Sequence, residues 1–403
     1  MAKKVQHSKQ RFAWFRLKPH SDGMITVIIL ILMLFGSLMI VSTNVGRTVY
    51  NSNVVLNTTI RQMIIMGIGY FLYIFSAKYF SIRWASFLEK FAFLGLVGLL
   101  GLTFFFSESG GSHAWIRLGS FTLQPSEFTK VFIVLTVALS LYRAKRKKKL
   151  YKKAMGMFKF PWICMAVFGG LILAQKDMGT LAILTMTFLT CLLIPSETHL
   201  VRGQKWIMRF LFIGIVSAIG LFGVTDIGTQ FLAKTSFTSH IATRIYNMKN
   251  PYENIYGEGY QSANSLYGIG SSNVVGKGIG DSSRKYGYLT QADNDYILAV
   301  IIEETGVFGF GLIVVMFLLL IGRLFYYAFK TNEVVFKVIL VGVGTYFFMH
   351  FFLNVGGVAC LIPFTGVPIL FISSGGSSLF AACLSLGICQ YCIRLIRERE
   401  MGV

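Results

Sequence analysis

The stretch at positions 24–43, MITVIILILMLFGSLMIVST, decides the fold because it contains no charged side chain. About 20 apolar residues are enough for a helix to cross the hydrocarbon core of a bilayer. A basic tail precedes this stretch, but no small-residue cleavage site follows it, so we expect a retained span rather than a secretory signal. The sequence therefore predicts an integral membrane protein.

Further apolar runs follow along the chain, separated by short polar stretches. Lipid offers no partner to a backbone N–H or C=O group, so runs of this length form helices, whose hydrogen bonds are internal. We therefore predict an all-α, polytopic membrane protein with about ten transmembrane helices. The expected spans are 24–43, 60–80, 85–106, 127–142, 160–174, 178–194, 206–224, 296–321, 335–353 and 378–393.

The composition excludes an ordinary soluble protein. Only 14% of the residues are charged and 54% are hydrophobic, whereas soluble domains carry about 25% charged residues. A net charge of +21 would suggest nucleic acid in a soluble protein, but Lys and Arg collect on the cytoplasmic side of membrane proteins. We therefore expect no nucleic-acid partner, and we interpret the basic run at 143–153, RAKRKKKLYKK, as a cytoplasmic loop.

The distribution of basic residues predicts the orientation of the chain. With a cytoplasmic N-terminus, 27 of the 38 Lys and Arg residues fall on the cytoplasmic side, as the positive-inside rule requires. An even number of spans returns the C-terminus to that side. We therefore divide the chain into a cytoplasmic basic tail (1–22), a ten-helix membrane domain (23–393) and a cytoplasmic C-terminal tail (394–403).

One long segment, 226–295, lies between two expected spans on the opposite, extracytoplasmic side. It is rich in Gly, Tyr, Ser and Asn, and it is too long for a simple connector. Functional groups concentrate on such loops. Its glycine-rich part, 266–280, lacks the Lys-Ser/Thr ending of a nucleotide-binding P-loop, and we expect it instead to be a flexible, turn-rich loop that lines a substrate cleft.

Two acidic clusters near the eighth span each allow two interpretations. Asp293, Asn294 and Asp295 would suit helix capping, or would hold a carboxylate near apolar walls that raise its pKa into the range of a general base. Glu303 and Glu304 lie inside the expected span, where carboxylates are costly. They form either a structural pair within the bundle or part of a functional site.

Further polar groups are expected on the same face of the membrane. Glu127 and Lys130 share one helix face, so they form a stabilising ion pair, or Lys130 joins Arg117 in holding an anionic headgroup. Asp177 lies at the tip of a short hairpin, which is either a solvated turn or part of the site. Clustering at the membrane surface favours a substrate whose headgroup lies at the interface and whose tail lies in lipid. A transporter would place its charges nearer the midplane.

Several separated blocks of the chain, in their order and spacing, resemble the shape, elongation, division and sporulation (SEDS) glycosyltransferases, the family of FtsW, RodA and SpoVE. The blocks are Arg61-Gln62, WIRLGSFTLQPSEFTK at 115–130, QKDMGT at 175–180, GYQSANSLYGIG at 259–270, GKGIGDSSRKYGYL at 276–289, ADNDYILAVIIEETG at 292–306 and IPFTGVPILFISSGGSS at 362–378.

The resemblance implies a SEDS-type fold of ten helices with both termini cytoplasmic. It also implies polymerisation of lipid II, a disaccharide pentapeptide on polyprenyl pyrophosphate, beside a class B penicillin-binding protein. Asp295 matches the essential carboxylate of the family. The resemblance places the substrate-binding residues at Arg61, Trp115, Arg117, Gln124, Ser126, Glu127, Lys130, Asp177, Arg244, Gln261, Glu303 and Ser377.

The chain departs from the family pattern around these residues. Lys176 replaces a proline, and Asp293-Asn294 replaces His-Thr before the essential aspartate. Thr290-Gln291 also replaces an upstream Pro-Glu. A second acid two residues away couples to the titration of Asp295, which leaves open whether Asp293 shares its role; the motif alignment favours Asp295.

We expect inverting glycosyl transfer with Asp295 as the base, with no cofactor certain and a divalent cation, Mg²⁺ or Mn²⁺, as a further aid to the departing charge. The resemblance implies other division proteins and membrane lipid as partners, and the division septum as the location, because the long loop is more similar to division-type than to elongation-type members. The alternatives are a lipid II flippase or transporter, an elongation-type polymerase and a non-catalytic scaffold.

Overall fold

A computed structural model describes residues 16–47, 52–108, 111–119, 121–146, 154–196, 198–225, 227–234 and 239–402. Most of the expected N-terminal tail and residues 147–153 of the basic loop lie outside these ranges, so the predictions for them stay predictions. The described part of the chain is mostly helical and contains only two short strands.

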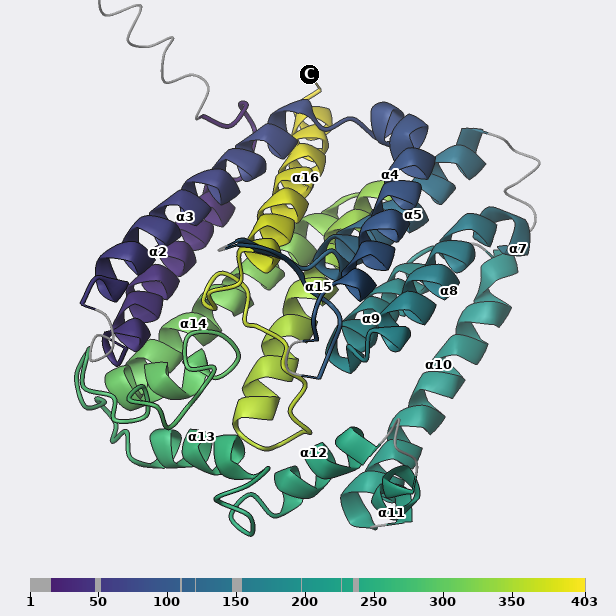
Figure 1. The fold of residues 1–403 in the computed structure, drawn as a ribbon. Helices are drawn as coiled ribbons and strands as arrows, with labels where there is room; N and C mark the ends of the chain where they lie inside the picture. The colour runs from purple at the N-terminus through teal and green to yellow at the C-terminus, as the bar shows by residue number, and fades with distance from the viewer. Residues whose placement is uncertain are drawn as a thin grey trace, which may run out of the picture.

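Ten long helices within the described residues form a bundle (Figure 1). Each overlaps one of the ten expected spans, which confirms the predicted fold class. Their bounds are α2 (Gly23–Val45), α3 (Val54–Tyr79), α4 (Ile82–Leu102), α5 (Ser126–Arg146), α8 (Lys159–Ala174), α9 (Met178–Leu193), α10 (Thr198–Ala218), α14 (Ile297–Lys330), α15 (Val334–Val358) and α16 (Gly376–Glu400).

The lengths and hydropathy of these helices indicate a multi-pass membrane protein. Seven helical stretches among the described residues are long and apolar enough to cross a membrane, and α8 and α9 are shorter apolar helices. An 18-residue apolar stretch within Leu200–Gly223 has no buried residue, so lipid is the natural surrounding of α10. Most of α15 and α16 is buried instead, and these two helices form the centre of the bundle.

The bundle has two different ends. At the terminal end, where α2 begins and α16 ends, Asp22 caps α2 by accepting from the N–H of Met24 (2.8 Å) and also accepts from Arg323 Nη2 (2.6 Å). At the opposite end, the loop end, lies the long segment between α10 and α14 (Figure 1). Both described termini of the bundle therefore lie on the same side, as the even number of spans predicts.

The long segment is more ordered than the sequence suggested. It contains three short helices, α11 (Ile227–Ala233), α12 (Ser239–Lys249) and α13 (Tyr260–Gly270). The stretch 266–280, expected to be a turn-rich loop, is helical as far as Gly270 and consists of turns and bends beyond it. The remaining described elements are η2 (Thr103–Phe105), β1 (Ile116–Leu118), β2 (Phe121–Leu123), α7 (Ala154–Met157) and the π-helix η3 (Ile219–Val224).

The strands β1 and β2 form a small antiparallel hairpin just before α5, with Ile116 opposite Leu123. The hairpin lies across the front of the bundle, over α16 (Figure 1). The second strand, β2, is followed directly by the residues that lead into α5. The hairpin therefore determines where residue 124 lies relative to the loop end of the bundle.

The helix α14 is kinked near its start and then runs nine residues past the expected end at 321. Gly306 at the kink has φ +61°, and Gly276 of the long segment has φ +85°. The two glycines pack backbone to backbone: a Cβ atom at Gly306 would lie 2.2 Å from the carbonyl oxygen of Val274, and one at Gly276 would lie 2.3 Å from that of Glu304. Only glycine fits such a contact at positive φ.

Beside this contact, Glu303 and Glu304 hold residues 271–285 against α14; we call these two carboxylates and their partners the clasp. Glu303 Oε1 accepts from Lys277 Nζ (2.6 Å), and Glu304 Oε1 accepts from Lys285 Nζ (3.1 Å). Glu304 Oε2 also accepts from Ser42 Oγ of α2 (2.7 Å). Of the two interpretations of this acidic pair, the structural one describes what the chain does.

Candidate functional site

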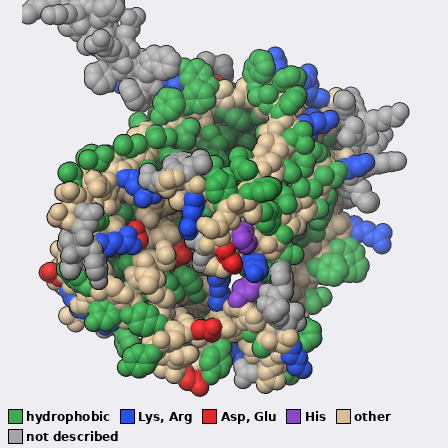
Figure 2. Space-filling model, viewed as in Figure 1, with side chains coloured by type: hydrophobic (Ala, Val, Ile, Leu, Met, Phe, Trp, Pro, Cys, Tyr) green, Lys and Arg blue, Asp and Glu red, His purple; other side chains and the backbone are tan. Residues whose placement is uncertain are grey.

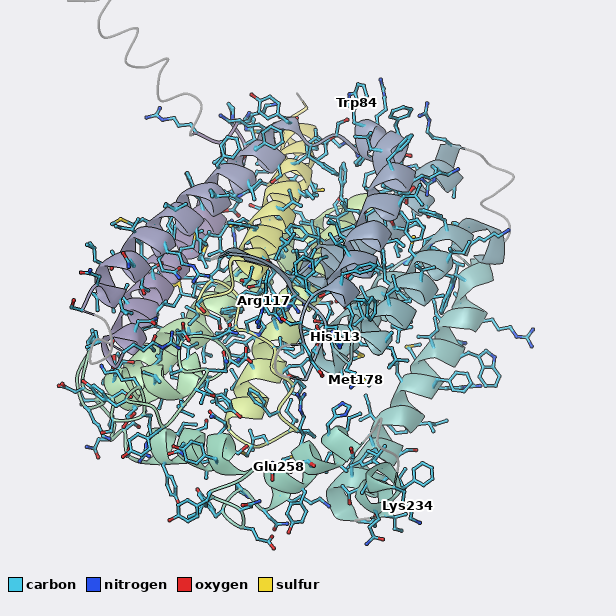
Figure 3. All side chains as sticks on the ribbon, viewed as in Figure 1. Trp84, His113, Arg117, Met178, Lys234 and Glu258 are labelled. Carbon is cyan, nitrogen blue, oxygen red and sulfur yellow. The ribbon has the colours of Figure 1, made fainter. Side chains whose placement is uncertain are left out.

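A polar cavity of about 550 Å³ opens at the loop end of the bundle. Charged and histidine side chains gather around the hollowed middle of the face seen in Figure 2, whereas hydrophobic side chains dominate the surface above it. Met178, at the start of α9, and Glu258, between α12 and α13, are lining residues from opposite sides (Figure 3). The lining comes from the segments 112–124, 176–180, 240–248, 258–262, 290–296 and 357–368.

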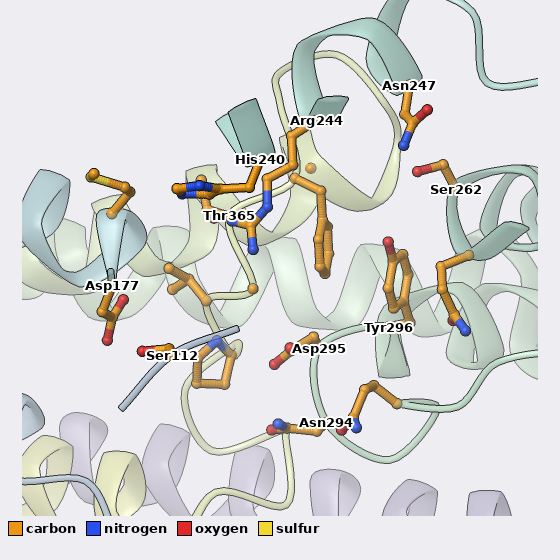
Figure 4. Close-up of a pocket in the computed structure, with 18 of the residues that line it drawn as sticks. Ser112, Asp177, His240, Arg244, Asn247, Ser262, Asn294, Asp295, Tyr296 and Thr365 are labelled. Atoms are coloured by element: carbon orange, nitrogen blue, oxygen red, sulfur yellow. The ribbon is translucent and has the colours of Figure 1, made fainter. Parts of the chain in front are cut away.

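Asp295 lines this cavity two residues before α14 begins (Figure 4). Asn354 of α15 holds its backbone in place: the Nδ2 of Asn354 donates to the carbonyl oxygen of Asp295 (2.9 Å) and to that of Val367 (2.8 Å). The side-chain Oδ1 of Asp295, in contrast, is buried without a hydrogen-bond partner among the described residues. Its backbone is therefore fixed while its carboxylate is left free for a ligand.

The surroundings of Asp295 raise the pKa of its carboxyl group. Burial raises the pKa of Asp295 from 3.8 to about 7; the positive charge of Arg244 opposes that rise, and the negative charges of Asp177 and Asp293 add to it. A general base works best when its pKa lies near the operating pH. The geometry and the pKa of Asp295 thus point to the same chemical role.

Asp293 takes a different position. Its Oδ1 accepts from Arg47 Nη2 (3.2 Å), and it is not among the residues that line the cavity. The N-cap of α14 is Tyr296, with no side-chain capping hydrogen bond, so the capping interpretation of this acidic cluster does not describe the structure. Between the two acids that the sequence left open, only Asp295 faces the cavity.

Basic groups occupy the wall across from Asp295. Arg244 of α12 extends toward Asp295 (Figure 4), yet it forms no hydrogen bond or ion pair with any described residue. His240, one turn earlier on α12, has a buried Nε2 without a partner among the described residues. Burial, Arg244 and Lys176 together lower the pKa of His240, so its ring is neutral near neutral pH.

Amide and carboxylate groups complete the lining. Gln124 Nε2 donates to Asp177 Oδ2 (3.0 Å), and Asp177 Oδ1 accepts from the N–H of Thr180, capping α9. Gln261 donates to Thr290 Oγ1 (2.9 Å), while its own Oε1 has no partner in the described part of the chain. With Trp115, the lining includes six residues that the sequence predicted: Trp115, Gln124, Asp177, Arg244, Gln261 and Asp295.

Glu127 and Lys130 lie beneath the cavity rather than in it. Lys130 Nζ donates to Glu127 Oε1 (2.7 Å) and to His350 Nε2 (3.0 Å). The other ring nitrogen of His350 lies 3.0 Å from the carbonyl oxygen of Pro368, which lines the cavity, so the ring carries its proton on Nδ1. The ion-pair interpretation of Glu127 and Lys130 therefore holds, and the pair supports the cavity floor.

Other predicted binding residues also lie outside the lining. Arg61 of α3 and Arg117 of β1 are exposed, and Figure 3 shows Arg117 in front of the bundle. Ser126 is fully buried, and Ser377 accepts from the N–H of Gln124 (3.0 Å), which makes it a support behind the lining. Glu303 belongs to the clasp. None of these residues is among those that line the cavity, and sequence does not give depth along the bundle axis; their role as substrate contacts stays a prediction.

Three residues that line or support the cavity were not predicted from the sequence: His240, His350 and Asn354. Asn354 and His350 lie one turn apart on α15, in an otherwise apolar span, and such isolated polar residues are a signal that could have found them. His240 lacks any such signal because the segment that contains it has no clear periodicity. The described residues contain no group of three or more His, Cys, Asp or Glu side chains that could hold a metal ion; the divalent cation stays a prediction.

Comparisons with known proteins all match this chain to one family. Residues 22–396 match the model of the FtsW, RodA and SpoVE family, described as cell cycle protein. The chain is 29% identical over 375 residues to the probable peptidoglycan glycosyltransferase FtsW of Bacillus subtilis (strain 168), over 92% of this chain and 90% of that protein. It is 28% identical to stage V sporulation protein E of the same organism, over 92% and 96% of the two chains.

Two solved structures share the fold. One, described as showing structural coordination of polymerization and crosslinking by a peptidoglycan synthase complex, superposes with a TM-score of 0.67 at 22% identity, over 93% of this chain and 98% of that one. The rod shape determining protein RodA of Thermus thermophilus superposes with a TM-score of 0.59 at 20% identity, over 94% and 97%.

Proposed function

This chain belongs to the FtsW, RodA and SpoVE family, and from that premise we propose that it is a peptidoglycan glycosyltransferase that polymerises lipid II into glycan strands. The observation that carries the proposal is the Asp295 carboxylate, which faces a polar cavity with one oxygen unpartnered among the described residues. Buried polar atoms normally have partners. A sugar hydroxyl that donates to this oxygen would supply the missing hydrogen-bond partner.

The reaction we propose is an inverting transfer. Asp295 accepts the proton of the acceptor sugar hydroxyl, and the oxygen of that hydroxyl attacks the anomeric carbon of the donor sugar. The bond between this carbon and the pyrophosphate oxygen breaks, and the electron pair leaves with the polyprenyl pyrophosphate. Arg244, which has no partner of its own in the described residues, stabilises the charge that develops on the leaving group.

The membrane places the two ends of the substrate. The exposed apolar surfaces of the bundle suit a polyprenyl tail dissolved in the bilayer, while the cavity at the loop end takes the sugar headgroup. The positive-inside rule favours a loop end that faces outward and termini that face the cytoplasm. The similarity to FtsW proteins supports a role in septal synthesis, with a class B penicillin-binding protein and other division proteins as partners.

The test is reconstitution in liposomes with lipid II, with and without a candidate penicillin-binding protein. A positioned general base contributes about 10²- to 10⁴-fold to a rate, so Asp295→Asn should lower glycan polymerisation by about that factor while the protein stays folded. Asp293→Asn is the matched control, because it removes a neighbouring carboxylate that does not line the cavity. Both rates are measured by gel separation of labelled glycan chains.

The same assay distinguishes the alternatives. A polymerase lengthens glycan chains, a flippase moves labelled headgroup across the liposome without lengthening it, and a scaffold does neither. Long chains made by Asp295→Asn at the rate of the unchanged protein would overturn the assignment of the base. Headgroup translocation without polymer would replace the proposed activity.

A further inference from the structure

Lys176 occupies a backbone conformation that seldom suits a lysine. Its φ is +62°, in the left-handed region where a Cβ atom crowds the following carbonyl oxygen. Glycine and, less often, asparagine are the usual residues at such a position. A non-glycine residue held in this region is worth a functional explanation.

In this chain, the local hydrogen bonds place a left-handed residue at this position. Lys176 lies two residues after the end of α8, and its N–H donates to the carbonyl of Leu173 (3.0 Å) while that of Asp177 donates to the carbonyl of Ile172 (3.2 Å). These two hydrogen bonds are the pattern of a Schellman motif, in which the residue at the Lys176 position is normally glycine. Glycine would therefore fold at least as well here, and the lysine side chain must be explained by something other than the turn.

The side chain of Lys176 lines the cavity. Its ammonium group forms no hydrogen bond or ion pair with a described residue. It lies near His240, whose pKa it helps to lower together with Arg244. Lys176, from the α8–α9 turn, and Arg244, from α12, thus place on the walls of one cavity two cations that have no partner in the described part of the chain.

The carboxylates of the cavity do not account for these cations. Asp177 is engaged by Gln124 and by the N-terminus of α9. Within the described residues, neither Asp295 nor Glu258 forms an ion pair with either basic side chain. An anionic ligand with two charged groups would give both Lys176 and Arg244 a partner of opposite charge. Within the proposed reaction, the only such group near the transferred sugar is the pyrophosphate of the donor.

We propose that Lys176 binds the pyrophosphate of the lipid-linked donor together with Arg244, so that each cation contacts the pyrophosphate group. The inference rests on the proposed function, because it takes lipid II as the donor. Lys176 is then a substrate-binding residue of this chain at a position where the family pattern has a proline.

The decisive variant is Lys176→Gly, which removes the charge and relieves the left-handed backbone. We expect its unfolding temperature to equal or exceed that of the unchanged protein. We also expect its KM for lipid II to rise about tenfold, the effect of losing one charge-assisted hydrogen bond, with a smaller change in kcat because the contact exists before and during the reaction. Raising the salt concentration should reduce the difference in KM between Lys176→Gly and the unchanged protein, because salt screens the attraction between the lysine and the pyrophosphate.

Two further variants serve as controls. Lys176→Arg restores a cation and should recover most of the lost affinity. Lys234→Gln removes an exposed charge at the end of α11, outside the cavity lining, and tests whether any loss of positive charge at the loop end raises KM.

The outcomes separate the inference from the proposed function. If the unchanged protein polymerises lipid II and Lys176→Gly shows the same KM, the role of Lys176 is wrong and the function stands. The role of Lys176 is equally wrong if Lys234→Gln raises KM as much as Lys176→Gly does. If the unchanged protein neither polymerises nor binds fluorescent lipid II in nanodiscs, the proposed function and the inference both fail.

Discussion

Asp295 and the pair Glu303 and Glu304 lie within ten residues of each other around the start of α14, and these carboxylates are used in opposite ways. In the clasp, Glu303 and Glu304 are fully buried and surrounded by lysines, serine hydroxyls and backbone N–H groups. At the cavity, Asp295 is only half-buried, and one of its oxygens has no partner among the described residues. Satisfied carboxylates hold the fold, whereas the unsatisfied one is the carboxylate that we propose contacts the substrate.

The contrast is clearest in the hydrogen bonds of Glu303. Its Oε2 accepts from Ser282 Oγ and from the N–H of Arg284, and its Oε1 accepts from Lys277. These bonds replace the water that an ionised carboxylate needs. A carboxylate at membrane depth is a functional candidate by default, but counting its partners decides whether that candidate is structural.

The largest effect that we expect is the loss of folding stability when a carboxylate of the clasp is removed. Glu304→Ala leaves Lys285, whose side chain is fully buried, without its carboxylate. Removing one partner of a buried pair typically costs about 3–5 kcal/mol. We expect a clearly lower midpoint of unfolding in detergent, followed by the intrinsic fluorescence of the tryptophans, with Asp295→Asn at least as stable as the unchanged protein. An unchanged midpoint in Glu304→Ala would show that the clasp does not hold the long segment.

The next effect is on pH dependence. The base must be ionised to accept a proton, and the pKa of Asp295 is raised to about 7. Below this pH the polymerisation rate should fall about tenfold per unit, and above it the rate should level off. Rates measured between pH ~5 and ~9 check this; a rate that is flat over the acidic half of that range would contradict the assignment of Asp295 as the base.

The same pKa shift predicts how stability depends on pH. The folded-state pKa lies above the ordinary 3.8, so the folded chain holds this proton more tightly than the unfolded chain does. The contribution of Asp295 to stability is therefore complete below pH ~4 and is lost as the pH rises to about 7. The advantage of Asp295→Asn over the unchanged protein should grow across that range and then stay constant.

The smallest effect concerns Asp293. Its ion pair with Arg47 is partly exposed, and such pairs contribute about 0–1 kcal/mol. Asp293→Asn should therefore barely change the unfolding midpoint. Since Asp293 adds to the rise in the pKa of Asp295, its removal should move the midpoint of the pH–rate profile to lower pH. A large loss of activity at high pH would show that Asp293 shares in the chemistry.

The membrane-spanning helices could be predicted because a bilayer imposes a length and an apolar composition on each of them. Their ends could not, since charged residues end an apolar run without ending a helix. α16 continues through Arg394–Glu400 and α14 continues to Lys330, beyond the ends that hydropathy suggested. The short helices of the long segment were missed because helices of this length depend on tertiary contacts rather than on their own sequence.

The chemical centre of the site could be predicted and its support could not. Asp295, Arg244 and Gln261 lie in blocks whose polar composition is distinctive. Whether a polar side chain lines a cavity or lies beneath it depends on its depth along the bundle axis, which sequence does not encode. Glu127 and Lys130 were predicted as part of the site and lie beneath the cavity lining, so their contact with substrate stays a prediction. His350, which extends that pair toward the cavity floor, was not predicted.

The hydrogen bonds of Asn354 give the two walls of the cavity different supports. One wall joins the start of α14, the end of α15 and the segment before α16 through the carbonyl oxygens of Asp295 and Val367. Helix α13 belongs to the same wall, because Ser265 Oγ donates to the carbonyl oxygen of Val358 at the end of α15 (2.8 Å). The other wall is α12, which carries His240 and Arg244 and packs against α11. Substitutions in α12 therefore change the lining of the cavity without removing the hydrogen bonds that hold the backbone of Asp295.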